Sequence, residues 1–239
     1  MGERARLGPL ADGVEGVRVR RTRGRSAPTL RTGGGPPSLA SSVAPSPLPL
    51  RLARAAARTV RDAVARRTAP PVVLAVRAER LTRQSPGALA ELHECVVAAE
   101  VADRPGVLVV AGDPGGGVAV VVADGRWSAR EVQVFGLADA EAATAALTRH
   151  GFRPDATRVS LRDGTPEADG EPVAVAFAAA PDADALREVV VPLVARLAVG
   201  GVLVVDASGP AALAVVEGAV ASRDVRLVRR SHLHAVRRS

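Results

Sequence analysis

The chain has 239 residues, of which 47% are hydrophobic and only 2% aromatic, and its net charge is +7. This length and apolar content are ample for one hydrophobic core, whereas the scarcity of aromatic side chains argues against a nucleic-acid site built on base stacking. The charge is uneven: residues 1–80 contain 16 arginines and 5 acidic residues, whereas the remainder contains 16 arginines and 20 acidic residues. The basic character therefore belongs to the N-terminal third.

Residues 1–48 are rich in Gly, Pro, Ser and Arg and show no apolar periodicity, which predicts a disordered basic tail. Its arginine cluster VRVRRTRGR would suit nucleic acid or acidic lipid, but a solvated tail is the simpler interpretation, so we do not expect either contact. The tail has no apolar stretch typical of a secretory signal, and no later segment is long and apolar enough to cross a membrane. We therefore expect a cytoplasmic protein.

Residues 49–103 predict two helices. In the first, over 50–67, arginines share one face and Ala, Val and Leu share the other. We expect this apolar face to pack on the main domain or on a second copy of the chain in a homo-oligomer, and Pro70-Pro71 to end the helix. The second helix, over 85–100, has Ser85 as its N-cap and Pro86 in its first position, and Cys95 is expected to be a buried thiol.

Residues 104–239 alternate between short Val-rich strands and helices, which is typical of a parallel sheet covered on both faces. The strands are expected at 107–111, 131–135, 157–161, 172–178 and 201–206 and the helices at 116–124, 138–150, 182–197 and 210–221. Two final strand-like pieces, 225–230 and 232–238, are joined too tightly for a crossover and predict an antiparallel hairpin. The fold class is therefore α/β, a Rossmann-like doubly wound sheet of about seven strands.

A glycine cluster, GDPGGG, follows the first of these strands and provides Gly112, Gly116 and Gly117. Glycines at a strand-to-helix turn admit a ligand close to the backbone, and the helix N-terminus favours a negative group. Val118 stands where a phosphate-binding loop needs Lys, and Pro114 breaks the dinucleotide spacing. Two interpretations stay open: a generic ligand loop, which would include Asp113, or glycines that serve only helix–strand packing.

Two acidic residues follow the next strands. Asp139 lies three residues later than the acid that usually ends the second strand, and it could hold ribose hydroxyls or simply cap the next helix. Asp163 follows the third strand and could meet an adenine or belong to an ordinary turn. His93 and His150 are on predicted helices with no carboxylate partner visible in the sequence, so no general base can be named. His232 and His234 share one face of the last strand, where they could bind a metal or simply face solvent.

The order of these pieces resembles the class I S-adenosylmethionine-dependent methyltransferases, and more closely the macrocin O-methyltransferase family. The resemblance rests on four segments: LTRQSPGALAEL (81–92), RPGVLVVAGDPGGG (104–117), VQVFGLADA (132–140) and LAVGGVLVVDA (197–207). It implies S-adenosylmethionine as the methyl donor, bound by Gly112, Gly116, Gly117 and Gly136, and a Mg²⁺ ion beside a small-molecule acceptor.

The departures from this family concern its acids. Val110 and Gly136 stand where the family has the acids of the first and second strands, and Ala179 and Ala207 replace two of its three metal-binding aspartates. Asp206 alone remains, and one carboxylate is a poor site for Mg²⁺. Asp182 and Asp184 could substitute for the lost ligands or could merely begin the helix at 182–197.

The resemblance thus implies an O-methyltransferase that acts on a natural-product sugar or related hydroxyl. The missing acids favour a second hypothesis, a catalytically inactive methyltransferase-like binding or partner protein. A third hypothesis is a protein tethered to nucleic acid or membrane by its first 80 residues.

Overall fold

The computed structural model describes residues 59–60, 63–64, 67–137, 139–154, 157–207, 209–221, 225–229 and 234–238. The predictions for the tail, 1–48, and for His232 lie outside these residues. Of the predicted helix over 50–67, the described residues are helical, but Val60 and Val64 are 63% and 56% exposed. They do not pack on the main domain, and cover by a second copy of the chain stays a prediction.

The centre of the fold is one seven-stranded sheet with the order β3-β2-β1-β4-β5-β7-β6. Its strands are β1 (Val107–Ala111), β2 (Val132–Phe135), β3 (Val159–Arg162), β4 (Val173–Ala179), β5 (Leu197–Asp206), β6 (Val225–Arg229) and β7 (His234–Arg238). The first five strands are parallel, and β7 pairs antiparallel with both β5 and β6. The predicted Rossmann-like sheet with a final hairpin is confirmed.

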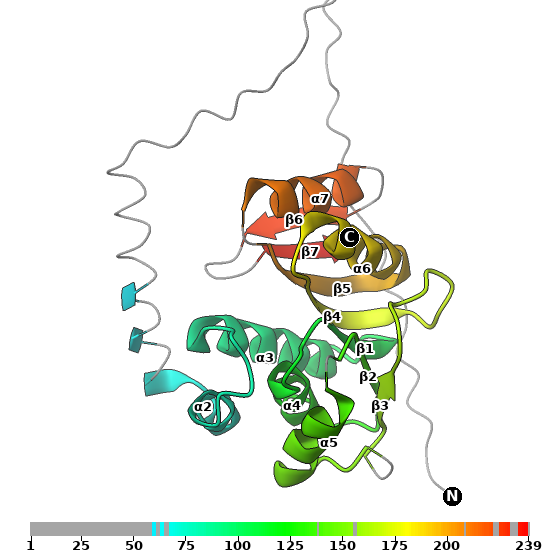
Figure 1. Cartoon of the computed structure of the whole chain (residues 1–239). Helices are drawn as coiled ribbons and strands as arrows, with labels where there is room; N and C mark the ends of the chain where they lie inside the picture. Colours follow the sequence, from blue (N-terminus) through cyan, green and yellow to red (C-terminus); the bar gives the residue numbers. More distant parts are fainter. Residues whose placement is uncertain are drawn as a thin grey trace, which may run out of the picture. The chain divides into compact units, whose positions relative to one another are not determined.

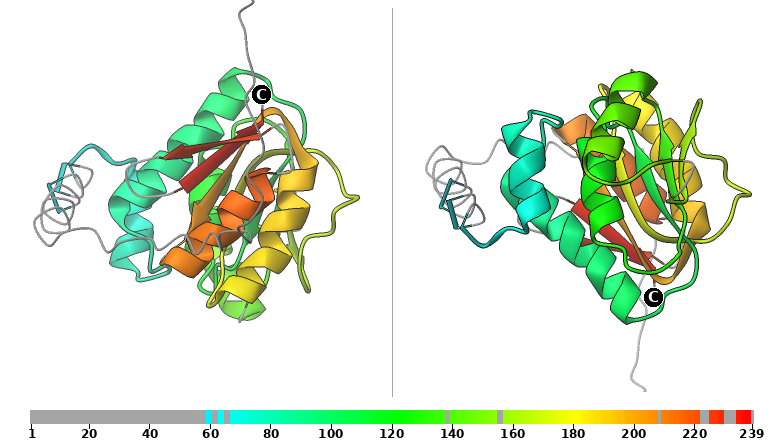
Figure 2. Two further views of the ribbon diagram at one scale, coloured as in Figure 1. Left: turned by 90° about the horizontal axis from the view of Figure 1, so that it is seen from above. Right: turned by 90° about the horizontal axis from the view of Figure 1, so that it is seen from below.

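Helices cover both faces of the sheet (Figures 1 and 2). One face carries α2 (Pro71–Ala78), α3 (Pro86–Val101), α4 (Gly117–Asp124) and α5 (Ala140–Arg149). The other carries α6 (Ala183–Arg196) and α7 (Pro210–Ala221). Because the strands are buried on both faces, their Val-rich runs need no polar alternation. Among the described helices, none is long and apolar enough to span a bilayer.

The helix α2 differs from the sequence prediction. Pro70-Pro71 was expected only to end a helix, but Pro71 is the first residue of α2, where a missing N–H costs nothing. Val73 and Val76 of α2 are fully buried. The next helix behaves as predicted, since the Ser85 side chain caps α3 by accepting the N–H of Ala88, and Cys95 is buried.

The strand β5 also begins earlier than expected, at Leu197 directly after α6. Its pairing with β4 shifts register between Val173 and Val175, and Gly200 lies in this region with a φ of +75°. Across this shift the pairing advances by two residues in β4 and by five in β5, from Leu197 to Val202, so β5 bulges out, and a glycine in the left-handed region accommodates such a bulge. The expected start at 201 marks the regular part of the strand.

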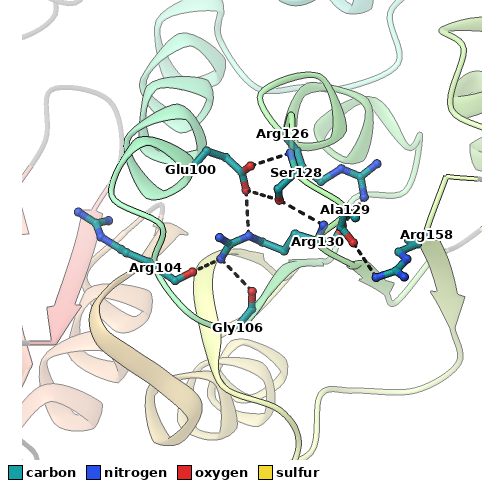
Figure 3. Close-up of polar contacts among 8 residues, drawn as sticks. All are labelled: Glu100, Arg104, Gly106, Arg126, Ser128, Ala129, Arg130 and Arg158. Atoms are coloured by element: carbon teal, nitrogen blue, oxygen red, sulfur yellow. Dashed lines mark hydrogen bonds and ion pairs between the residues drawn. The ribbon is translucent and has the colours of Figure 1, made fainter. Parts of the chain in front are cut away.

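The N-terminal ends of the strands are tied together by a buried polar network around Glu100 (Figure 3). Its carboxylate lies 2.9 Å from Arg130 Nε and accepts the N–H of Ser128 at 2.9 Å. Arg130 also donates to the carbonyl of Gly106 at 2.9 Å and to that of Arg104. The network joins the end of α3 to the entries of β1 and β2, at the end of the sheet opposite the carboxyl ends of the parallel strands.

Candidate functional site

The sheet changes winding direction between β1 and β4. The chain after β1 runs to α4 on one face, whereas the chain after β4 runs to α6 on the other face. In open α/β sheets this divergence leaves a crevice at the carboxyl ends of the two strands, and ligands bind there. Gly112 follows β1 at this point, and Ala180 and Pro181 follow β4.

Of the hollows in the described part of the chain, two lie at the carboxyl edge of the sheet, and a third extends from that edge along β2 and β3 to the residues that precede β2 and β4. The first, of about 350 Å³, is lined by Thr82, Arg83, Gln84, Gly112, Asp113, Pro114, Val118, Gly136, Phe177, Ala179, Ala180, Pro181 and Asp206. The second, of about 160 Å³, shares the residues of the crevice with the first: Gly112, Gly136, Ala179, Ala180 and Pro181. The third, of about 670 Å³, shares Phe135 and Thr165 with the second. Small-molecule sites occupy roughly 300–1,000 Å³, so the first hollow with its neighbour is large enough.

The third hollow lies where the fold lacks a helix. Residues 163–172 connect β3 to β4 without regular secondary structure, as predicted for 162–171. The face of β2 and β3 beneath this connection is polar: Glu131 accepts a hydrogen bond from Ser160 at 2.6 Å and lies 3.1 Å from Arg162. The pKa of Glu131 is lowered, and the hydrogen bond from Ser160 is the main cause. This face is an open groove beside the crevice.

Among the glycines of the cluster, Gly112 both packs against the end of β4 and lines the crevice. Its φ is +83°, and a Cβ there would lie 1.8 Å from the carbonyl oxygen of Ala179. Only glycine allows the chain after β1 to pass the end of β4 this closely. The backbone of Gly112 is thereby exposed to both the first and the second hollow.

The other two predicted donor glycines of the cluster are packed against protein. A Cβ on Gly116 would lie 2.9 Å from the Cα of Ala143 in α5, and one on Gly117 would lie 2.8 Å from Val76 Cγ1. The N–H of Gly117 donates to the carbonyl of Leu81 at 3.3 Å. Neither glycine lines the hollows described above, so the packing interpretation accounts for both.

Asp113 supplies the negative group at the start of α4. The residue is 2% exposed, and its Oδ2 accepts the N–H of Val118 at 2.7 Å and that of Ala119 at 3.2 Å. Burial raises the pKa of Asp113 to about 6, and the two N–H groups offset part of that rise. The helix N-terminus that could have bound a ligand anion is therefore occupied by the chain's own carboxylate.

Gly136 stands where the resembling family has an acidic residue, and it borders the crevice. Its φ is +67°, and a Cβ there would meet only the backbone of Gly112, at 3.6 Å. It lines both of the smaller hollows. Val110 stands where the family has the acid of its first strand, and it is fully buried in β1 among apolar side chains.

Asp139 and Asp163, the two acidic residues proposed to contact a nucleoside, have different surroundings. Asp139 is the N-cap of α5, where its Oδ1 accepts the N–H of Ala142 at 2.8 Å, and it is not among the residues that line the three hollows. The capping interpretation of Asp139 is thus confirmed. Asp163 is exposed and lines the third hollow, next to the loop residues that border the second.

The carboxylates considered for a metal do not come together. Asp206 lies at the end of β5 and lines the first hollow, and its pairing partner at the end of β4 is Ala179. Asp182 caps α6 by accepting the N–H groups of Asp184 and Ala185, and Asp184 is ion-paired with Arg187 at 2.7 Å. Within the described ranges there is no group of three His, Cys, Asp or Glu side chains that could hold a metal ion. The side chains around Asp206 therefore do not fit Mg²⁺.

Gln84 is a site residue that the sequence did not reveal. Its amide Nε2 donates to Asp206 Oδ2 at 2.7 Å, across 122 positions of sequence. The segment before α3 folds over the glycine cluster, with Leu81 beside Gly115 and Gly117. The only sequence signal was its place in the LTRQS segment of the resemblance, which did not single out the glutamine.

Two histidines have carboxylate partners that the sequence did not show. His93 Nε2 lies 3.1 Å from Asp124, and His150 Nε2 lies 3.2 Å from Glu79. Neither histidine lines the three hollows of the described chain. No histidine is therefore brought to the crevice by these pairs.

Comparisons with known proteins agree with this fold. No protein-family model matches the sequence, and no curated protein sequence is similar to it. The structure is similar to that of the SAH-bound methyltransferase PaMTH1 from Podospora anserina, with a TM-score of 0.57, 14% identity, and coverage of 83% of this chain and 99% of that chain.

Two bacterial structures are similar as well. A methyltransferase from Geobacter sulfurreducens has a TM-score of 0.51 at 21% identity, with coverage of 72% of this chain and 91% of that chain. The O-methyltransferase TomG from Streptomyces achromogenes, in complex with SAM, has a TM-score of 0.50 at 17% identity, covering 70% of this chain and 88% of that chain. At these identities the likeness establishes the Rossmann-like fold.

Proposed function

We propose that this protein is an S-adenosylmethionine-dependent O-methyltransferase whose acceptor is a small molecule with a hydroxyl group, such as a natural-product sugar. The observation that supports this best is the crevice at the ends of β1 and β4, where Gly112 and Gly136 leave the backbone open to a ligand. The proposal is also supported by two similar structures, one in complex with SAM and one bound to SAH.

In this proposal the donor extends along the hollows at the carboxyl edge of the sheet. Gly112 would hold its methionine end, and Gly136 and Asp163 would hold its adenosine end. When bound, the donor would supply an activated methyl group on a sulfonium: the acceptor oxygen would gain the methyl as the S–C bond breaks, leaving a neutral thioether, and the hydroxyl proton would pass to water. The chain contributes by holding the two reactants in line.

The acceptor would occupy the part of the first hollow that is bordered by Gln84 and Asp206. Both side chains line this hollow, as do Thr82 and Arg83, and Asp206 ends β5, which β1 and β4 separate from β2 and Gly136. A hydroxyl group can both donate to a carboxylate and accept from an amide. Their position therefore supports an acceptor with a hydroxyl group over one that is wholly apolar.

The second candidate, a catalytically inactive methyltransferase-like binding or partner protein, is favoured by one observation. The crevice has no carboxylate at Gly136, and Asp139 is engaged as a helix cap. A ribose would then lack the acidic partner that usually holds its hydroxyls in this fold.

Isothermal titration calorimetry of the full chain with SAM and with SAH separates these candidates. Saturable binding of both, followed by methyl transfer to a panel of hydroxylated acceptors, supports the enzyme. Binding without transfer to any acceptor supports the inactive protein, and no binding at millimolar ligand contradicts the proposed donor site.

A further inference from the structure

The surroundings of Asp206 differ from those of a metal-binding carboxylate. Asp206 pairs with Ala179 across β4 and β5 and is followed by Ala207, so its two neighbours at the strand ends provide no side-chain ligand atoms. The nearest alternatives along the chain, Asp182 and Asp184, are engaged at the start of α6. A divalent cation here would have a single side-chain carboxylate, whereas hard cations take six or more oxygen ligands.

The contact that Asp206 makes is with an amide. Gln84 Nε2 lies 2.7 Å from Asp206 Oδ2. A carboxylate can only accept, so the amide must present its NH₂ group here, and an amide nitrogen has no lone pair for a cation. The position next to Asp206 is thereby filled by a hydrogen-bond donor.

Gln84 is held in this place by its own segment. Its backbone N–H donates to the Thr82 side chain at 3.2 Å, and the following residue, Ser85, caps α3. The carbonyl of Thr82 in turn accepts from Arg77 Nη1 at 2.8 Å. The amide is thus positioned by the fold before any ligand binds.

We infer that Gln84 takes the place of a divalent cation at Asp206, so that this site binds its ligands without a metal ion. The Gln84 amide does not neutralise the charge of Asp206, but it donates a hydrogen bond to one carboxylate oxygen and fixes the orientation of the carboxylate. The inference deepens the proposed function, because it concerns the same hollow, yet cation binding can be measured independently of the donor.

The test measures Mn²⁺ binding, by electron paramagnetic resonance of the free ion, to the full-length wild type and to Gln84→Glu, Gln84→Met and the double variant Gln84→Glu/Asp206→Asn. The change to Glu replaces the amide with a second carboxylate of the same length beside Asp206. We expect negligible binding by the wild type, at least about tenfold tighter binding by Gln84→Glu, and no gain in the other two variants.

Circular dichroism and thermal melting establish that each variant is folded, and Gln84→Met shows what loss of the amide alone does. Tight Mn²⁺ binding by the wild type, or no gain in a folded Gln84→Glu variant, would overturn the inference. SAH titrations with Mg²⁺ and with EDTA are run in parallel, and identical affinities in the two are expected. If SAH fails to bind at all while the Mn²⁺ pattern is as expected, the proposed function fails and the inference on Asp206 stands.

Discussion

A β-carbon on Gly112 would lie 1.8 Å from the carbonyl oxygen of Ala179, so even the smallest side chain would overlap the backbone of β4. Gly136 has a similar positive φ, but a β-carbon there would meet nothing closer than 3.6 Å. We therefore expect Gly112→Ala to lower the free energy of unfolding by more than about 3 kcal/mol, and Gly136→Ala to lower it by only about 1–2 kcal/mol, the cost of the left-handed conformation. Urea unfolding of the two variants measures the difference.

The comparison of these two glycines controls for backbone strain, since both alanines adopt a positive φ. Equal losses of stability in the two variants would contradict the close approach of β1 and β4 at the crevice. A larger loss for Gly112→Ala shows that this glycine serves packing as well as access.

Gly136 also allows a gain-of-function test of the donor site. Asp is among the residues that tolerate a positive φ, and the space around Gly136 is open. If the missing acid limits ribose binding, Gly136→Asp tightens SAH binding about tenfold, which is a single good hydrogen bond to a charged group. Calorimetry measures it, with Gly136→Asn and Gly136→Ala as controls. Unchanged SAH affinity in all three variants would place the ribose elsewhere.

Asp113 gives a prediction about pH. Its pKa is raised by burial to about 6 from 3.8, so the folded state holds its proton more tightly than the unfolded state does. The contribution of this group to stability is therefore complete below about pH 3.8 and is lost as the pH rises through about 6. The full difference corresponds to roughly 3 kcal/mol.

We expect the free energy of unfolding of the wild type, relative to that of Asp113→Asn, to fall by roughly 2–3 kcal/mol between pH 4 and pH 7. Asn keeps an acceptor for the N–H groups of Val118 and Ala119 but does not titrate. Urea unfolding at several pH values measures it. A difference that is constant with pH, or that rises, would show that hydrogen bonding to the helix N-terminus outweighs burial.

The network at the opposite end of the sheet predicts a large effect on stability with none on binding. Glu100 is 7% exposed and lies 2.9 Å from Arg130, whose Nη1 is also bonded to backbone carbonyls. Glu100→Ala leaves this arginine without its carboxylate and is expected to cost roughly 3–5 kcal/mol. Asp184→Ala is a matched control, because its ion pair with Arg187 is as short, 2.7 Å, but exposed, and is expected to cost less than about 1 kcal/mol.

Thermal melting compares the two variants, and SAH calorimetry below the melting temperature tests the separation from the crevice. Similar stabilities for Glu100→Ala and Asp184→Ala would contradict the structural role of the Glu100 network. A large change in SAH affinity in the Glu100→Ala variant would mean that the network also affects ligand binding at the crevice.

Most of the fold could be predicted because local runs of apolar residues show which segments are buried. The strand at 107–111 and the helix at 210–221 agree with the structure residue for residue, since the Val-rich strand lies between two glycines and the Ala- and Val-rich helix begins at a proline. The helix α2 was missed because a proline pair stops one helix and starts the next equally well. The early start of β5 depends on a bulge against β4, which is a tertiary contact.

The site was less predictable, because its residues acquire their roles only through contacts between distant segments. Gly112 and Gly136 were identified, but the sequence could not distinguish them from Gly116 and Gly117, which pack against α5 and α2. Asp113 was placed with the ligand residues, whereas its carboxylate faces the helix behind it. Gln84 could not be recognised, because its partner Asp206 is 122 positions away.

The central claim is that the crevice beside Gly112 binds S-adenosylmethionine and its product, and titration of the wild type with SAH tests it most directly. We predict saturable binding with a stoichiometry of one per chain, unchanged by EDTA. Calorimetric traces that show no binding of SAH at millimolar concentration, by a chain shown to be folded, would contradict the account.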